Sequence, residues 1–244
     1  MAATAMTKTW RNRWLGLMLA CVALPALAGD DQDDLDALQG RLDSQWQLVK
    51  ADKLRNIRTW ARQEDGKRFR SFKVQAELEA SAETLVRVML DFDNYSRWYW
   101  QVSESRLLKR VSPTEYYVYL RHRAPYGLPD RDVILHAEVE PQTATRNFVT
   151  LKVRAIPDYL PPRPPLVRVL SEDMAIRFTP TPEGHVLVES EGYIDPGGRA
   201  PSWAFNLIQR SAPYMVVVGL ARVAEREEYR LAHTPMPFPV LSRM

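Results

Sequence analysis

The chain has 244 residues, of which 45% are hydrophobic and 26% are charged. This balance is that of a folded globular protein, and it excludes disorder over most of the length. Basic residues outnumber acidic ones by 33 to 30, and three of the basic ones (Lys8, Arg11, Arg13) lie within residues 1–28, which contain no acidic residue. The rest of the chain holds 30 of each sign, so we expect no nucleic-acid binding, which depends on an excess of positive charge.

Residues 1–28 have the three parts of a secretory signal peptide. The basic residues come first, an apolar segment runs from Trp14 to Leu24, and Ala26-Leu27-Ala28 supplies small residues before a cleavage site. The apolar segment is too short to cross a bilayer, which takes about 20 helical residues. We expect cleavage after residue 28 and a periplasmic location; an uncleaved anchor, a buried N-terminal helix and a lipoprotein cleaved before Cys21 are the alternatives.

The residue types of the exported part do not suggest catalysis or metal binding. Cys21 is the only cysteine, so its removal leaves no thiol for a disulfide, a thiolate metal site or a nucleophile. The sequence also lacks a Gly-x-Ser-x-Gly motif. No two of the four histidines have the spacing of zinc ligands: His122, His136, His185 and His233. We therefore expect no catalytic residue, no metal and no other cofactor.

Residues 29–52 are predicted to form an N-terminal amphipathic helix that packs on the following domain. Acidic residues come first, which suits the positive end of a helix dipole. Apolar residues then recur at every third or fourth position, as on one face of a helix. They are Leu35, Leu38, Leu42, Trp46 and Val49.

Beyond this segment the hydrophobic pattern has a period of two, which indicates strands. Strands at 56–62 and 69–78 form a hairpin around the turn dipeptide Asp65-Gly66. A helix from Ser81 to Asp91 and an aromatic connection follow. Further strands are predicted at 103–111, 114–122, 131–140, 145–155, 166–171, 173–179 and 185–194. Together, these strands predict an antiparallel sheet of about nine strands with one apolar face.

Two proline-rich segments interrupt or follow these elements. Residues 156–165 contain five prolines, which exclude helix and regular strand, and this stiff loop exposes Ile156, Tyr159 and Leu160. A long helix is then predicted from Pro201 to about residue 229, with a kink at Pro213. Residues 231–244 are predicted to be an extended or disordered tail.

The apolar face of the sheet has to be covered, and the long C-terminal helix is the most apolar cover available. A sheet of this size twists and curls, and one helix does not fill the hollow. We therefore expect an apolar cavity that holds a small hydrophobic molecule. The residues predicted to line it are Val118, Leu120, Val133, Leu135, Val149, Leu151 and Val153 of the strands and Trp203, Leu207 and Met215 of the helix.

Four segments, in the right order, resemble the START family. Tyr126 to Val133 contains an Arg-Asp pair that opens a central strand, and Asp195-Pro-Gly-Gly before Pro201-Ser-Trp resembles the beginning of the family's last helix. Leu166 to Val169 and the helix from Ser81 to Asp91 with Trp98 also fit. The resemblance covers about residues 45–228.

The resemblance implies an α+β helix-grip fold over residues 53–230, with the curved sheet wrapped around the C-terminal helix. It implies a monomer that binds one hydrophobic small molecule (a lipid, fatty acid, sterol or isoprenoid), with transfer and transient membrane contact as further expectations. The gate would be the 156–165 loop and the C-terminal helix, and Arg131 and Asp132 are candidate polar anchors. Some members carry a cavity arginine where this chain has Ala137, which argues against an anchor of that kind.

Two other functions remain open from the sequence. Related helix-grip proteins include aromatase/cyclases and hydrolases, and an enzyme of this type would need ionisable groups that point inward. The apolar residues predicted to point inward disfavour it. The third possibility is an envelope module in which the N-terminal helix or the tail binds a partner protein.

Overall fold

The computed structural model describes residues 45–125, 127–199 and 202–240, without the side chains of residues 202, 203 and 206. The expected signal peptide, residues 29–44 of the expected N-terminal helix, and residues 241–244 of the expected tail lie outside this part of the chain.

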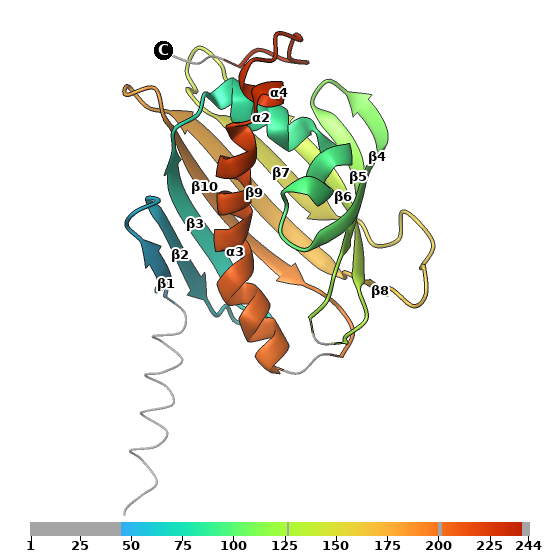
Figure 1. The fold of residues 1–244 in the computed structure, drawn as a ribbon. Coiled ribbons are helices and arrows are strands. Elements are labelled where there is room, and N and C mark those ends of the chain that lie inside the picture. Colours follow the sequence, from blue (N-terminus) through green and yellow to red (C-terminus); the bar gives the residue numbers. More distant parts are fainter. Residues whose placement is uncertain (1–44, 126, 200–201, 241–244) are drawn as a thin grey trace, which may run out of the picture. The chain divides into compact units, whose positions relative to one another are not determined.

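Ten strands form one curved sheet that wraps around a long helix (Figure 1). The sheet order is β1-β2-β3-β10-β9-β7-β6-β5-β4, every neighbouring pair is antiparallel, and β8 pairs in parallel with β6. The strands are β1 (Gln47–Asp52), β2 (Ile57–Arg62), β3 (Ser71–Leu78), β4 (Val102–Ser112), β5 (Glu115–His122), β6 (Arg131–Glu140), β7 (Val149–Ala155), β8 (Val167–Arg168), β9 (Ser171–Pro180) and β10 (Val186–Asp195). The expected antiparallel sheet and the β2–β3 hairpin are confirmed.

The helices are α2 (Ala82–Leu90), the 3-10 helix η1 (Phe92–Arg97), α3 (Ser202–Ala224) and α4 (Glu227–Arg230). Helix α2 begins where the sequence predicts, because the Ser81 hydroxyl accepts a hydrogen bond from the Thr84 N–H at 3.0 Å. Among the described residues, no helix is both long enough and apolar enough to cross a membrane.

Several boundaries differ from the prediction; in particular, the long C-terminal helix, predicted to run to about residue 229, ends at Ala224, and α4 is separate from it. Gln47–Asp52 is an edge strand paired with β2, so the expected helix over 29–52 is wrong for these residues. Most side chains of β1 are exposed, and its backbone hydrogen bonds to β2 decide its conformation in place of a buried helical face. The expected strand 166–171 shortens to two residues, and the strand expected from 145 begins at Val149.

Two helical layers cover the inner face of the sheet. Helix η1 packs on β4, α2 packs on β9, and α3 packs on β2 and β3. Rings from η1 also reach β5, where the Phe92 and Tyr116 centroids lie 5.1 Å apart. The segment that was predicted only as an aromatic connection therefore fills one half of the hollow with its side chains.

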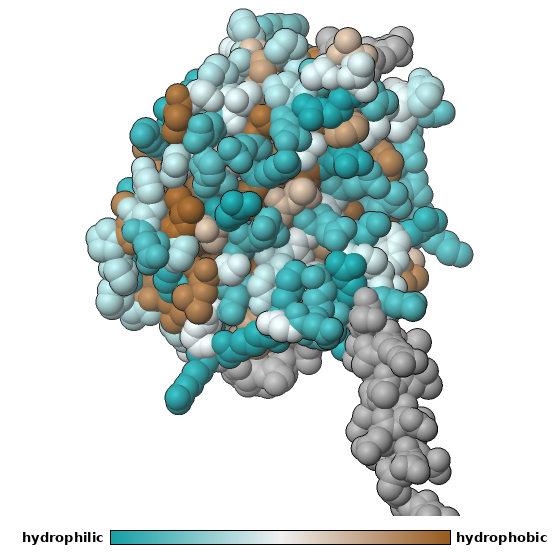
Figure 2. All heavy atoms as spheres, turned by 180° about the vertical axis from the view of Figure 1, so that it is seen from behind, coloured by the Kyte–Doolittle hydropathy of each residue, from teal (hydrophilic) through white to brown (hydrophobic). Residues whose placement is uncertain are grey.

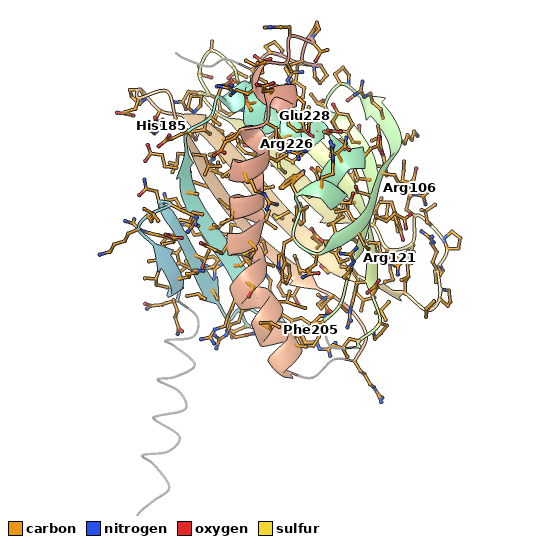
Figure 3. All side chains as sticks on the ribbon, in the orientation of Figure 1. Arg106, Arg121, His185, Phe205, Arg226 and Glu228 are labelled. Atoms are coloured by element: carbon orange, nitrogen blue, oxygen red, sulfur yellow. The ribbon has the colours of Figure 1, made fainter. Side chains whose placement is uncertain are left out.

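The C-terminal end of the helical layer is held by several polar contacts. The Tyr229 hydroxyl of α4 donates to the Asp91 carboxylate at 2.6 Å. Glu228 accepts ion-pair contacts from Arg226 at 3.2 Å and from Arg97 at 3.3 Å, at the upper end of α3 in Figure 3.

The described part of the C-terminal segment, residues 231–240, contains no helix or strand, but it is not detached from the domain. Phe238 is only 7% exposed and joins the hydrophobic core. Arg87 of α2 donates to both the hydroxyl (2.6 Å) and the carbonyl (2.8 Å) of Thr234. Residues 231–240 therefore lack helix and strand, but the alternative of a disordered tail is wrong for them, because they pack on the domain.

Gly219 of α3 lies against the backbone of Trp98, the residue that follows η1. A Cβ atom at this position would lie 2.3 Å from the carbonyl oxygen of Trp98, much closer than van der Waals contact allows. We predict that Gly219→Ala lowers the free energy of unfolding by about 1–3 kcal/mol, the usual cost of overpacking. Alanine has a higher helix propensity than glycine, so without a clash the substitution should raise the free energy of unfolding. A decrease would therefore identify the clash. Urea unfolding measures it, with exposed Arg222→Ala on the next turn as control; a stabilised Gly219→Ala protein would contradict the close approach.

Candidate ligand cavity

A cavity of about 190 Å³ lies between α3 and the inner face of the sheet. Most of its wall is apolar and comes from α2, β3, β9, β10 and α3. These apolar residues are Phe72, Val74, Met89, Met174, Ile176, Val188, Ile194, Ala204, Phe205, Ile208, Ala212, Pro213, Val216, Val217 and Leu220. The expected apolar space is therefore present, but it is formed by other residues than those predicted.

The seven strand residues predicted to line the cavity do point inward, but none of them lines it. Val118, Leu120, Val133, Leu135, Val149, Leu151 and Val153 are all buried in the hydrophobic core. They belong to β5, β6 and β7, and the aromatic rings of η1 pack over this half of the sheet. The prediction therefore placed these residues on the correct, inner face of the sheet, but they lie in the half that η1 covers and not in the half that borders the cavity.

The prediction for the residues of the helix failed for a different reason. Leu207 and Met215 are 39% and 40% exposed and lie away from the cavity, so their prediction is wrong. The side chain of Trp203 lies outside the described residues. Helix α3 is apolar on almost every side, and its hydrophobic periodicity therefore does not define which face packs inward.

The proline-rich loop does not lie at the cavity. Its Tyr159 ring stacks on Tyr117 of β5 at 4.7 Å, and the Ile156 N–H donates to the Ile134 carbonyl at 2.9 Å. Tyr117 and Ile134 alternate with the inward-facing residues of their strands, so the loop covers the outer face of the sheet. None of Ile156, Tyr159 and Leu160 lines the cavity.

Figure 2 shows the molecule from behind, where most of the surface is hydrophilic. Hydrophobic residues gather mainly toward the left edge of this view, which is the side of β8 and of the proline-rich loop in Figure 1.

The candidate anchors Arg131 and Asp132 point to opposite faces of β6, because successive side chains of a strand alternate. Asp132 is 1% exposed and forms an ion pair with Arg168 at 2.9 Å. Arg168 also donates to carbonyls of the proline-rich loop, at 2.9 Å for Leu160. Asp132 therefore has a structural contact on the outer side, while Arg131 lines the cavity.

One end of the cavity is bordered by loops. The β5–β6 loop contributes Arg123, Ala124 and Leu128, and the first turns of α3 lie opposite. The Phe205 ring of α3 packs on Phe69 with centroids 4.3 Å apart. Figure 3 labels Phe205 at this lower end of α3. We call this the loop end of the cavity.

Six ionisable side chains line the cavity: Arg70, Tyr99, His122, Arg123, Arg131 and Glu172. Burial raises the pKa of Glu172 to about 7 and lowers the pKa of His122 to about 4. Burial, with a smaller effect of the Glu172 charge, raises the pKa of Tyr99. His122 is therefore neutral at physiological pH, and Glu172 titrates close to it.

Glu172 was not predicted as a site residue, although the alternation in its strand contains a signal for it. In β9 the buried positions are Glu172, Met174, Ile176 and Phe178, separated by exposed residues. A carboxylate in phase with three apolar residues of one strand is the expected mark of a buried acid. Glu172 lies one residue before the predicted start of this strand, and the alternation was therefore not followed to it.

No group of three or more described histidine, cysteine, aspartate or glutamate side chains is arranged to hold a metal ion. The polar end of the cavity can therefore offer hydrogen bonds and charge, and its apolar wall can enclose a hydrocarbon.

The raised pKa of Glu172 has a consequence for stability. The folded state holds the proton more tightly than the unfolded state, so Glu172 lowers stability progressively as the pH rises from about 4.5 through 7. We compare the free energy of unfolding of Glu172→Gln with that of the natural protein. We predict that the difference in favour of Glu172→Gln grows by about 2–3 kcal/mol when the pH is raised from 5 to 8.

Urea unfolding at both pH values measures this difference. Glu138, an exposed acid on the outer face of β6, supplies the control variant Glu138→Gln. Parallel pH profiles for the natural protein and Glu172→Gln would show that the carboxyl is not desolvated.

Comparison with other proteins finds no matching family model. An uncharacterised protein of Pseudomonas aeruginosa is 24% identical over 181 residues, which are 74% of this chain and 87% of that protein. START domain-containing protein 10 of mouse and of human is 28% identical over 137 residues, which are 55% of this chain and 46% of those proteins. The match therefore spans about half of the mouse and human proteins.

Two solved structures have the same fold. A fragment of the STAR-related lipid transfer protein from Xanthomonas axonopodis is 30% identical, with a TM-score of 0.68 over 74% of this chain and 99% of that one. Human STARD10 is 23% identical, with a TM-score of 0.63 over 84% of this chain and 83% of that one. The predicted helix-grip architecture is confirmed by both.

Proposed function

Because the chain belongs to the START family of STAR-related lipid-transfer domains, we propose that it binds a single hydrophobic ligand in the cavity between α3 and the sheet. The observation that supports this proposal is the apolar wall of that cavity. Removing a methylene group from water contributes about 0.8 kcal/mol, so an alkyl chain needs few polar contacts to bind. We propose a binding protein that acts outside the cytoplasm, on the basis of the signal-peptide pattern in residues 1–28.

The volume of the cavity limits what fits without rearrangement. Ligand pockets commonly measure about 300–1,000 Å³, and 190 Å³ lies below this range. A long-chain lipid therefore requires α3 or the loops to move outward. Binding of such a lipid would therefore be coupled to a conformational change of the protein.

The contacts along α3 indicate which part opens. Its C-terminal half is fastened by the Tyr214 hydroxyl, which donates to Asp52 at 2.7 Å, and by the close approach of Gly219 to Trp98. Its N-terminal half lies over the loop end, and Pro213 separates the two halves. We propose that ligands pass between this half and the β5–β6 loop, and not past the proline-rich loop.

Cavity filling tests whether the ligand occupies this space. We predict that Ala212→Trp, which places an indole in the cavity, weakens binding of a fluorescent fatty-acid probe at least tenfold. Leu207→Trp is the control, since Leu207 faces outward on the same helix. Fluorescence titration of the folded variants measures the affinities. Equal loss in both variants, or a natural protein that binds no fatty acid, phospholipid or isoprenoid, would refute the proposal.

Two matched aromatic truncations test the route. Phe205→Ala removes the ring that packs on Phe69 at the loop end, and we predict about tenfold faster probe release. Tyr159→Ala removes the ring that stacks on Tyr117 outside the sheet, and release should stay within twofold. Stopped-flow displacement gives both rates. The reverse result would place the gate at the proline-rich loop.

A second candidate function is acid–base chemistry on the bound ligand. It is favoured by the location of Glu172 and His122, which bring an acid and an imidazole to a cavity whose predicted inward strand residues are all apolar. A pKa of about 7 suits Glu172 to proton transfer at neutral pH. Mass spectrometry of ligands incubated with the protein separates the two functions, because only an enzyme would change their mass or isomer composition.

A further inference from the structure

Glu172 and Arg131 are charged side chains buried in the cavity wall, with exposed fractions of only 6% and 8%. None of the described residues donates a hydrogen bond to the Glu172 carboxyl. The guanidinium of Arg131 donates to the Pro129 carbonyl at 2.6 Å, and no described carboxylate lies within 4 Å of it. The cavity therefore presents a buried acceptor and a buried cationic donor with unused hydrogen-bonding capacity.

These two groups lie toward the same end of the cavity. Arg131 is the direct cross-strand partner of His122 in the β5–β6 pair. The His122 ring contacts the Tyr99 ring edge-on at 6.1 Å, and Tyr99 lies close enough to Glu172 to respond to its charge. A chain of neighbours thus connects the acid to the guanidinium at the loop end.

Buried polar groups that lack partners are costly, and native proteins rarely retain them without a reason. A ligand head group can satisfy both at once if it donates to the Glu172 carboxylate and accepts from the Arg131 guanidinium. A carboxylate head cannot do so, because it would place a second negative charge beside Glu172 in a dry site.

We propose that the loop end of the cavity selects an uncharged lipid head group that both donates and accepts hydrogen bonds, an amide or an alcohol, over a carboxylate. The inference rests on the proposed function, since it assigns the head-group preference of the same site. Glu172 is the specificity-determining residue, and Arg131 supplies the complementary donor.

Apart from Glu172 and Arg131, the ionisable groups on the described wall are Arg70, Tyr99, His122 and Arg123. The pKa of His122 is lowered to about 4 and that of Tyr99 is raised, so both stay neutral between pH 6 and 8. Protonation of Glu172 is therefore the change in the wall that should relax discrimination against a carboxylate as the pH falls.

The test uses three ligands with the same twelve-carbon chain: dodecanamide, 1-dodecanol and dodecanoate. Each displaces the fluorescent reporter N-phenyl-1-naphthylamine from the purified protein, expressed from the full chain. At pH 8 we expect the amide and the alcohol to bind at least tenfold more tightly than dodecanoate. At pH 6 dodecanoate should improve about tenfold, because Glu172 is then mostly protonated.

Two variants separate charge from hydrogen bonding. Glu172→Gln keeps the shape and the hydrogen bonds, so the amide should stay within about threefold, while dodecanoate gains at pH 8 and loses its pH dependence. Glu172→Leu should also weaken the amide at least tenfold. Glu138→Gln, on the outer face, should match the natural protein. If the leucine variant fails to fold, the glutamine variant still decides the charge effect.

The failures of the two proposals are distinguishable. If the reporter binds and all three head groups displace it equally, or if Glu172→Gln leaves the ranking unchanged, the head-group assignment is overturned and ligand binding stands. If neither the reporter nor any twelve-carbon ligand binds to the natural protein, both proposals are overturned.

Discussion

The inner face of the curved sheet has to be shielded from water, and the rest of the structure follows from how this is done. Two separate layers shield it, the aromatic helix η1 with α2 over one half and α3 over the other. The first layer packs tightly, as the Phe92–Tyr116 contact shows, while α3 leaves an apolar space beneath it. The cavity therefore exists because the side chains of η1 and α2 fill the space over their half of the sheet, whereas those of α3 do not.

The sequence predicted the elements of this fold well and their contacts less well. Alternation identified every long strand, and the Ser81 cap marked the beginning of α2, because both signals are local. The strand β1 was missed because its conformation depends on hydrogen bonds to the edge of β2, which no periodicity within the segment reveals. Likewise, the packing of Phe238 against the core depends on contacts with residues far away in the sequence.

The site was less predictable for the same reason. Strand alternation correctly placed Val133 and its equivalents on the inner face, but it does not say which half of that face a distant aromatic segment will cover. In α3, hydrophobic residues on nearly all sides made the inward face ambiguous, and Leu207 was assigned wrongly. Alternation also implies that neighbours such as Arg131 and Asp132 separate, one to the cavity and one to the ion pair with Arg168 that holds the outer loop.

Glu172, His122 and Arg131 lie toward the loop end of the cavity, while Met89 and Leu220 belong to the mostly apolar part of its wall. An amphiphile that passes between the β5–β6 loop and the N-terminal half of α3 would therefore travel tail first and stop when its head reaches the polar groups. The length of its alkyl chain would be limited by the extent of the apolar wall, and its head could extend past the loops toward solvent. Such a cavity would limit the length of the tail, while substituents that lie beyond the recognised head group could remain in solvent.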